Sequence, residues 1–134
     1  MIRKNEVMDY LKELETNDLL ETLYLFGSWA NEPENPGRDL DLAVIFTPRL
    51  DQERILWDCR DLQAKIAADL QLPVDLIDLE IAPVYLGQVI LQTGILIFCK
   101  DEERRLETSL YIFRNYQDPQ AAKGYPWEVS DIDE

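Results

Sequence analysis

The segment Leu-Tyr-Leu-Phe-Gly-Ser at residues 23–28, followed after ten residues by Asp-Leu-Asp at residues 39–41, decides the fold. The first four residues are an apolar run of strand length. Gly27-Ser28 then opens a short helical turn, whose free N–H groups and positive dipole end can hold a phosphate. The turn signal Asn-Pro-Gly at 35–37 leads into a second strand. The spacing therefore predicts a strand–loop–strand unit with a phosphate-binding turn.

The two aspartates of this unit point to a metal. Asp39 and Asp41 begin the run Asp-Leu-Asp-Leu-Ala-Val-Ile-Phe at 39–46, which otherwise has the composition of a buried strand. Side chains two residues apart share one face of a strand, and two like charges there are costly unless a cation compensates them. Mg²⁺ prefers such oxygen ligands and keeps part of its shell for phosphates. The alternative is a solvated strand edge on an acidic chain.

A third carboxylate comes from the apolar run Val-Asp-Leu-Ile-Asp-Leu at 74–79, the third predicted strand. Asp75 and Asp78 are three apart, so on a regular strand they point to opposite faces, and only one can join the first pair. We assign Asp75 to the site, as a base or a further metal ligand. Asp78 is then a capping or paired residue near the strand end. The structural alternative for Asp75 is a partner for a buried Arg or Lys.

Composition limits the chemistry. The chain has 134 residues, no histidine and a net charge of −14. The absence of histidine excludes Ser-His-Asp and Cys-His catalysis and the usual zinc sites. The acidity argues against free nucleic acid as the main ligand and favours a basic protein partner, although solubility alone would also explain it. Cys59 and Cys99 are expected to be reduced core thiols. No segment predicts a membrane span or signal peptide, so we expect a cytoplasmic protein.

The remaining pattern alternates helices and strands. Such alternation indicates an α/β or α+β sheet with helices on its faces. The last helix carries the apolar stripe Leu106, Leu110, Phe113 and Tyr116. We expect one domain over 1–117 and an acidic, flexible tail over 118–134, although Tyr125, Pro126 and Trp127 there can also dock on a basic surface. The predicted helices span 4–16, 51–71 with Asp51 as its cap, a segment from Pro83, and 102–116, and the strands span 23–26, 39–46, 74–79 and 95–99.

The pattern Gly27-Ser28-x10-Asp39-x-Asp41, with Val-Asp-Leu at 74–76, resembles the nucleotidyltransferase fold of the DNA polymerase beta superfamily. Within it, the chain is similar to the minimal nucleotidyltransferases, over 20–80 by motif and 1–116 by size and element order. The resemblance implies a small mixed sheet of about four strands flanked by helices. Arg38 departs from the small residue that relatives often have before the first aspartate, and we expect it to be a surface loop residue.

The resemblance also implies an activity. Many minimal nucleotidyltransferases are antitoxins paired with a HEPN-domain ribonuclease toxin, and the chain would transfer AMP from ATP to a tyrosine of such a toxin. Gly27 and Ser28 would hold the nucleotide, while Asp39, Asp41 and Asp75 would bind Mg²⁺. The alternatives are a small-molecule nucleotidyltransferase of the aminoglycoside-modifying type and a non-catalytic antitoxin that only binds its partner. Trp29 would stack near the nucleotide or, as we expect, pack in the core.

Overall fold

A four-stranded mixed sheet organises the computed structural model, which describes residues 3–32, 39–48 and 52–117. The strand order is β3-β2-β1-β4. β1 pairs antiparallel with both β2 and β4, whereas β2 and β3 run parallel. The expected small mixed sheet flanked by helices is therefore confirmed. The elements in chain order are α1 (Lys4–Glu13), the 3₁₀ helix η1 (Leu14–Thr16), β1 (Leu20–Phe26), α2 (Ser28–Asn31), β2 (Leu40–Phe46), α3 (Gln52–Leu70), β3 (Val74–Asp78), α4 (Val84–Thr93), β4 (Ile95–Cys99) and α5 (Glu102–Gln117).

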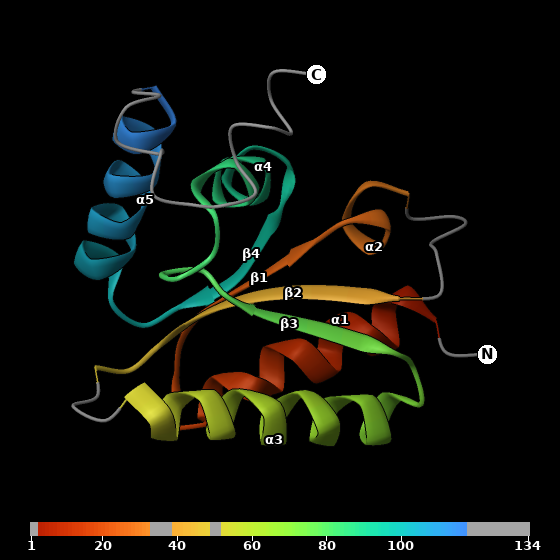
Figure 1. Cartoon of the computed structure of the whole chain (residues 1–134). Helices are drawn as coiled ribbons and strands as arrows, with labels where there is room; N and C mark the ends of the chain where they lie inside the picture. The colour runs from red at the N-terminus through yellow and green to blue at the C-terminus, as the bar shows by residue number, and fades with distance from the viewer. Residues whose placement is uncertain (1–2, 33–38, 49–51, 118–134) are drawn as a thin grey trace.

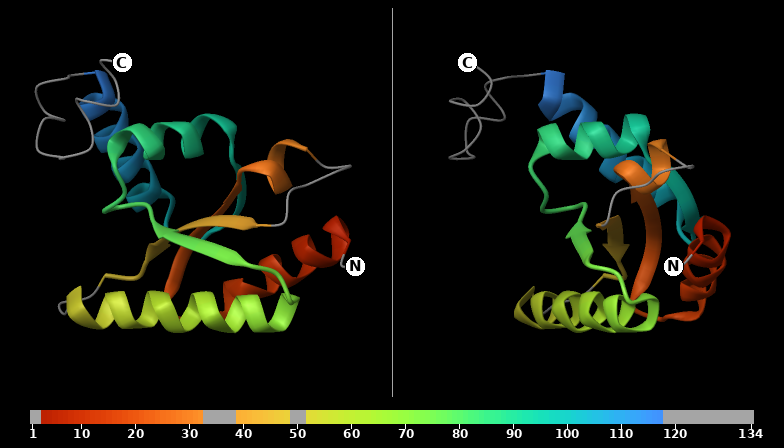
Figure 2. Two further views of the ribbon diagram at one scale, coloured as in Figure 1. Left: turned by 45° about the vertical axis from the view of Figure 1, so that its right-hand side comes forward. Right: turned by 90° about the vertical axis from the view of Figure 1, so that its right-hand side faces the viewer.

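The sheet separates two helical layers (Figure 1). α1 and α3 cover one face, and α4 and α5 lie over the other, on the same side as the short α2; the rotated views agree (Figure 2). Leu42 of β2 belongs to the larger apolar cluster with Leu11 of α1 and Ile66 of α3. Ala43, one residue later, belongs to the second cluster with Ile112 of α5. This alternation along β2 is what a strand buried on both faces requires.

Most predicted elements form close to their expected bounds, with one extension and one shift. β1 begins at Leu20, three residues earlier than the apolar run suggested, because Glu21 and Thr22 are buried members of the strand. β2 begins at Leu40, so Asp39 lies in the bend just before it. The expected cap Asp51 and the tail over 118–134 lie outside the described residues. The domain boundary at 117 stays a prediction.

The last helix packs differently from what its apolar stripe would suggest. An amphipathic helix usually buries its stripe. In α5 the buried positions are Thr108 and Ile112, while Leu106, Leu110 and Phe113 are each about half exposed (50–51%). Tyr116 is exposed as well. Within the described ranges, no helix is both long and apolar enough to cross a membrane.

Candidate functional site

Gly27 marks the point where β1 ends and α2 begins. Its φ is +73°, in the left-handed region that glycine adopts without steric cost. A Cβ added there would collide with Oδ2 of Asp41 and lie 3.1 Å from Cγ of the same carboxylate. The backbone of the turn therefore lies directly against Asp41, and any side chain at position 27 would separate them.

Three strands bring the site residues into one row across the sheet. Phe26, just before Gly27, is the antiparallel partner of Asp41. Asp41 is in turn the parallel partner of Asp75 on β3. Asp41 shares its face with Ala43, whose side chain packs on the α4–α5 side of the sheet. The turn after β1 and the two carboxylates thus meet at one end of that face.

The carboxylates repel one another. Asp41 is partly buried, and burial together with the nearby charges of Asp75 and Asp39 raises the pKa of its carboxyl group. Asp39 and Asp75 are exposed. Among the described residues, no three side chains of the metal-binding types are gathered tightly enough to hold an ion as they lie. The donor set nevertheless suits a hard divalent cation, because it consists of carboxylate oxygens whose mutual repulsion a cation would relieve.

The phosphate-binding turn predicted at Gly27-Ser28 forms the start of α2. The carbonyl oxygen of Gly27 accepts backbone hydrogen bonds from Ala30 and Asn31, both at 3.1 Å, and one from the Asn31 side-chain nitrogen at 3.0 Å. Ser28 is the first residue of the helix and is partly buried. Trp29 is only 4% exposed and belongs to the larger apolar cluster, so it packs in the core as expected. Arg38 lies outside the described residues.

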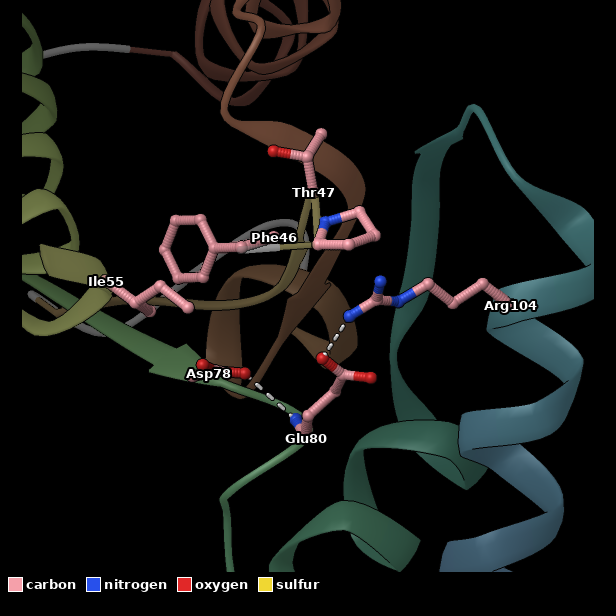
Figure 3. Close-up of a pocket in the computed structure, with 7 residues that line it drawn as sticks. Phe46, Thr47, Ile55, Asp78, Glu80 and Arg104 are labelled. Atoms are coloured by element: carbon pink, nitrogen blue, oxygen red, sulfur yellow. Dashed lines mark hydrogen bonds and ion pairs between the residues drawn. The ribbon is translucent and has the colours of Figure 1, made fainter. Parts of the chain in front are cut away.

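Asp78 does not join the row. It is the parallel partner of Val44, at the far end of β3 from Asp75. Its carboxylate accepts a hydrogen bond from the backbone N–H of Glu80 at 3.0 Å, which is the paired role that the sequence suggested. Burial raises the pKa of Asp78 despite that bond. It lines a separate cavity of about 230 Å³ beside Phe46 and Arg104 (Figure 3).

No pattern in the sequence predicts the charged network near this cavity. Arg104 of α5 lies 2.5 Å from a Glu80 oxygen and 3.4 Å from Oε1 of Glu21. Glu21 is 7% exposed, and burial raises its pKa while Arg104 lowers it. The apolar run beginning at residue 23 gave no reason to include Glu21 in the strand. Because Glu21 and Arg104 are 83 residues apart, no local pattern links them.

These features define a class of site: a strand ending in a glycine turn, a short helix, and carboxylates on the next two strands. The chain belongs to the polymerase beta nucleotidyltransferase family, whose model matches residues 9–103. That range includes Gly27, Ser28, Asp39, Asp41 and Asp75.

Relatives and solved structures agree with this membership. The protein adenylyltransferase MntA of Shewanella oneidensis is 30% identical over 93 residues, which are 69% of this chain and 63% of that protein. The chain thus aligns with less than two thirds of that relative. A toxin–antitoxin structure with AMP-PNP matches with a TM-score of 0.69 and 24% identity, covering 99% of this chain and 100% of that one. A tri-AMPylated Shewanella oneidensis HEPN toxin in complex with its MNT antitoxin matches with a TM-score of 0.68, 23% identity and coverages of 98% and 99%. At these identities the two structures show the shared fold.

Proposed function

We propose that this chain is an antitoxin that acts as a protein adenylyltransferase, transferring AMP from ATP to a tyrosine of a HEPN-domain toxin. The observation that carries the proposal is the row formed by Gly27, Asp41 and Asp75 at one end of the sheet. Its support from relatives is the named activity of the Shewanella protein and the AMPylated toxin in the complex of similar fold. A cytoplasmic location is part of the proposal, since ATP is the substrate.

In this mechanism the chain positions two reactants. The Gly27-Ser28 turn holds the terminal phosphates of ATP against the carboxylates. Asp39 and Asp41 would hold Mg²⁺ with Asp75 as a further ligand or base, and the ion would neutralise charge on the phosphates. The acceptor's phenolic oxygen attacks the α-phosphorus and forms a new O–P bond. The bond between the α-phosphorus and its bridging oxygen breaks, and pyrophosphate leaves with the electron pair.

Asp75 is the residue best placed to take the tyrosine proton. It is exposed at the strand surface, directly beside Asp41 in the parallel register. An acceptor hydroxyl approaching from solvent would meet this carboxylate before the more enclosed Asp41. General-base assistance of this kind contributes about 10²–10⁴-fold to a rate.

The test is transfer of radiolabelled AMP from ATP to a co-expressed HEPN-domain partner in the presence of Mg²⁺. Wild type should label the partner. Asp41→Asn and Asp75→Asn should reduce labelling about 100-fold or more, whereas Asp78→Asn is the matched control on the same strand and should keep it. Equal labelling by the Asp75 and Asp78 variants would contradict the assigned third carboxylate. Tight binding without label from wild type would instead favour a non-catalytic antitoxin, and labelling of an aminoglycoside would favour a small-molecule enzyme.

A further inference from the structure

The exposed side of α5 carries a continuous apolar stripe. Leu106, Leu110 and Phe113 are spaced four and three residues apart, so they line one side of the helix. Each is about half exposed, at 50%, 50% and 51%. Single exposed apolar residues are ordinary, but a contiguous row of large ones is typical of an interaction surface. We call these three residues the α5 stripe.

Exposed apolar side chains are concentrated on this helix. Five of the eleven large exposed hydrophobic residues among the described positions lie on α5, and two more, Tyr85 and Val89, lie on the neighbouring α4. The opposite helical layer contributes only two from α3, Leu56 and Trp57. The layer of α1 and α3 therefore exposes few large apolar side chains, whereas the layer of α4 and α5 exposes most of them.

The α5 stripe is on the layer that covers the site face of the sheet. Along β2, Ala43 and Ile45 follow Asp41 on the same face, and both pack in the cluster that contains Ile112 of α5. α4 and α5 lie over this face in Figure 1, on the same side as α2. A protein seated on α5 would therefore stand on the same face of the sheet as the carboxylates, with α5 over one end of that face and α2 over the other (Figure 1).

The charges around the stripe select the kind of partner. Arg104 is occupied by Glu21 and Glu80, and Arg105 is paired with Glu102 and donates to the Tyr24 hydroxyl at 3.1 Å. Two exposed acids and one exposed base border the stripe: Glu103 lies three residues before Leu106, Glu107 three before Leu110, and Arg114 four after Leu110. With a net charge of −14, the molecule repels acidic surfaces. A second copy would carry the same net charge of −14 and would be repelled as a whole.

We propose that the α5 stripe is the docking surface for a protein partner whose apolar patch is bordered by Lys or Arg. This inference rests on the proposed function, because it assigns to that partner the AMP acceptor. Docking on α5 positions the acceptor on the carboxylate side of the sheet, and the acidic border both steers and orients the encounter. Binding at α5 and chemistry at β2 and β3 are then carried by separate residues.

The experiment compares two variants that each remove exposed apolar side chains. The first is Leu106→Ser/Leu110→Ser/Phe113→Ser, and the matched control is Leu56→Ser/Trp57→Ser on α3, on the other side of the sheet. Calorimetric titration with the HEPN-domain partner gives Kd, and labelling from radiolabelled ATP gives transfer. Melting curves and AMP-PNP binding, which the stripe should not affect, establish that each variant is folded.

We expect the stripe variant to bind the partner at least about tenfold more weakly and to transfer AMP poorly at low partner concentration, with the α3 control unchanged. Unchanged Kd for the stripe variant overturns the inference while leaving the proposed function intact. If wild type binds the partner through the stripe but transfers no label, the docking surface is supported and the proposed adenylyltransferase activity is contradicted. Self-association of wild type that the stripe substitutions abolish would also overturn the inference, since the occupant would be a second copy.

Discussion

Replacing Asp41 by asparagine should stabilise the metal-free protein while removing its function. Asp41 is the most enclosed of the three carboxylates, and burial, Asp75 and Asp39 all disfavour its charged form. The substitution keeps the shape of the side chain and removes the charge. Natural binding and active sites commonly hold such unfavourable arrangements, which their ligands then relieve.

The magnitude follows from Coulomb's law. Asp41 and Asp75 are directly opposite on neighbouring strands, which are about 5 Å apart. Two unit charges at that distance repel by about 1 kcal/mol in water and about 3 kcal/mol at an effective dielectric constant of about 20. Because Asp75 is exposed, the lower part of this range applies, about 1–2 kcal/mol. For a chain of this length that corresponds to a rise of roughly 3–6 °C in Tm.

The assay is thermal unfolding at neutral pH, first with a chelator and then with Mg²⁺. Without metal, Asp41→Asn should melt above wild type, while Asp61→Asn, an exposed site on α3 that changes net charge equally, should not. Mg²⁺ should raise the Tm of wild type more than that of Asp41→Asn, since binding to the native state stabilises it. The reasoning would be refuted if Asp41→Asn had a Tm at or below that of wild type in chelator. It would also be refuted if Mg²⁺ raised the Tm of Asp41→Asn as much as that of wild type.

Three further outcomes follow from single sites. Gly27→Ala should cost about 1–2 kcal/mol in urea unfolding and weaken AMP-PNP binding, because φ is +73° and the new Cβ would push the Asp41 carboxylate away. Lys65, whose Nζ lies 2.8 Å from Asp69, lowers the pKa of that carboxyl group. This pair should therefore stabilise the fold above the ordinary aspartate pKa, and the stabilisation should be lost as pH falls through the lowered pKa. Asp69→Asn should remove this pH-dependent part of the unfolding free energy, measured by urea unfolding over a range of pH. Leu42→Ala, at a fully buried position of β2, should cost about 2–5 kcal/mol in the same unfolding assay without changing Kd for AMP-PNP in the folded fraction.

Local signals were sufficient for most elements. The apolar run before Gly27 and the period-two pattern after Asp39 gave the two central strands, and β4 forms over the expected 95–99. Alternation limited the third carboxylate to one of Asp75 and Asp78, and the apolar neighbours of Asp75 favoured it. The parallel register places Asp75 beside Asp41 and Asp78 beside Val44. Whether these residues bind Mg²⁺ and ATP stays a prediction that the labelling and melting experiments test.

The residues that sequence reasoning misjudged depend on contacts between distant segments. The polar Glu21 does not fit an apolar strand pattern, yet it is buried in β1, where its ion pair with Arg104 of α5 offsets the cost of burying its charge. The α5 pattern identified an apolar stripe correctly but not its exposure, because burial of a helix face is decided by where α4 and the sheet lie. Ile112 packs against Gly87 of α4, and that contact turns Leu110 outward.

Salt should affect the two proposed ligands in opposite directions. ATP is an anion approaching a molecule of net charge −14, so screening by salt reduces a repulsion and should tighten AMP-PNP binding at fixed Mg²⁺. A basic partner approaching Glu103 and Glu107 on α5 is attracted, so the same salt should weaken its Kd. Titrations from low to moderate ionic strength can follow both constants, with Glu103→Gln/Glu107→Gln expected to flatten only the partner's dependence. If AMP-PNP binding also weakens with salt, the local charge of the site rather than the net charge governs nucleotide binding. If Glu103→Gln/Glu107→Gln keeps the full salt dependence of partner binding, the attractive role assigned to these two glutamates is wrong.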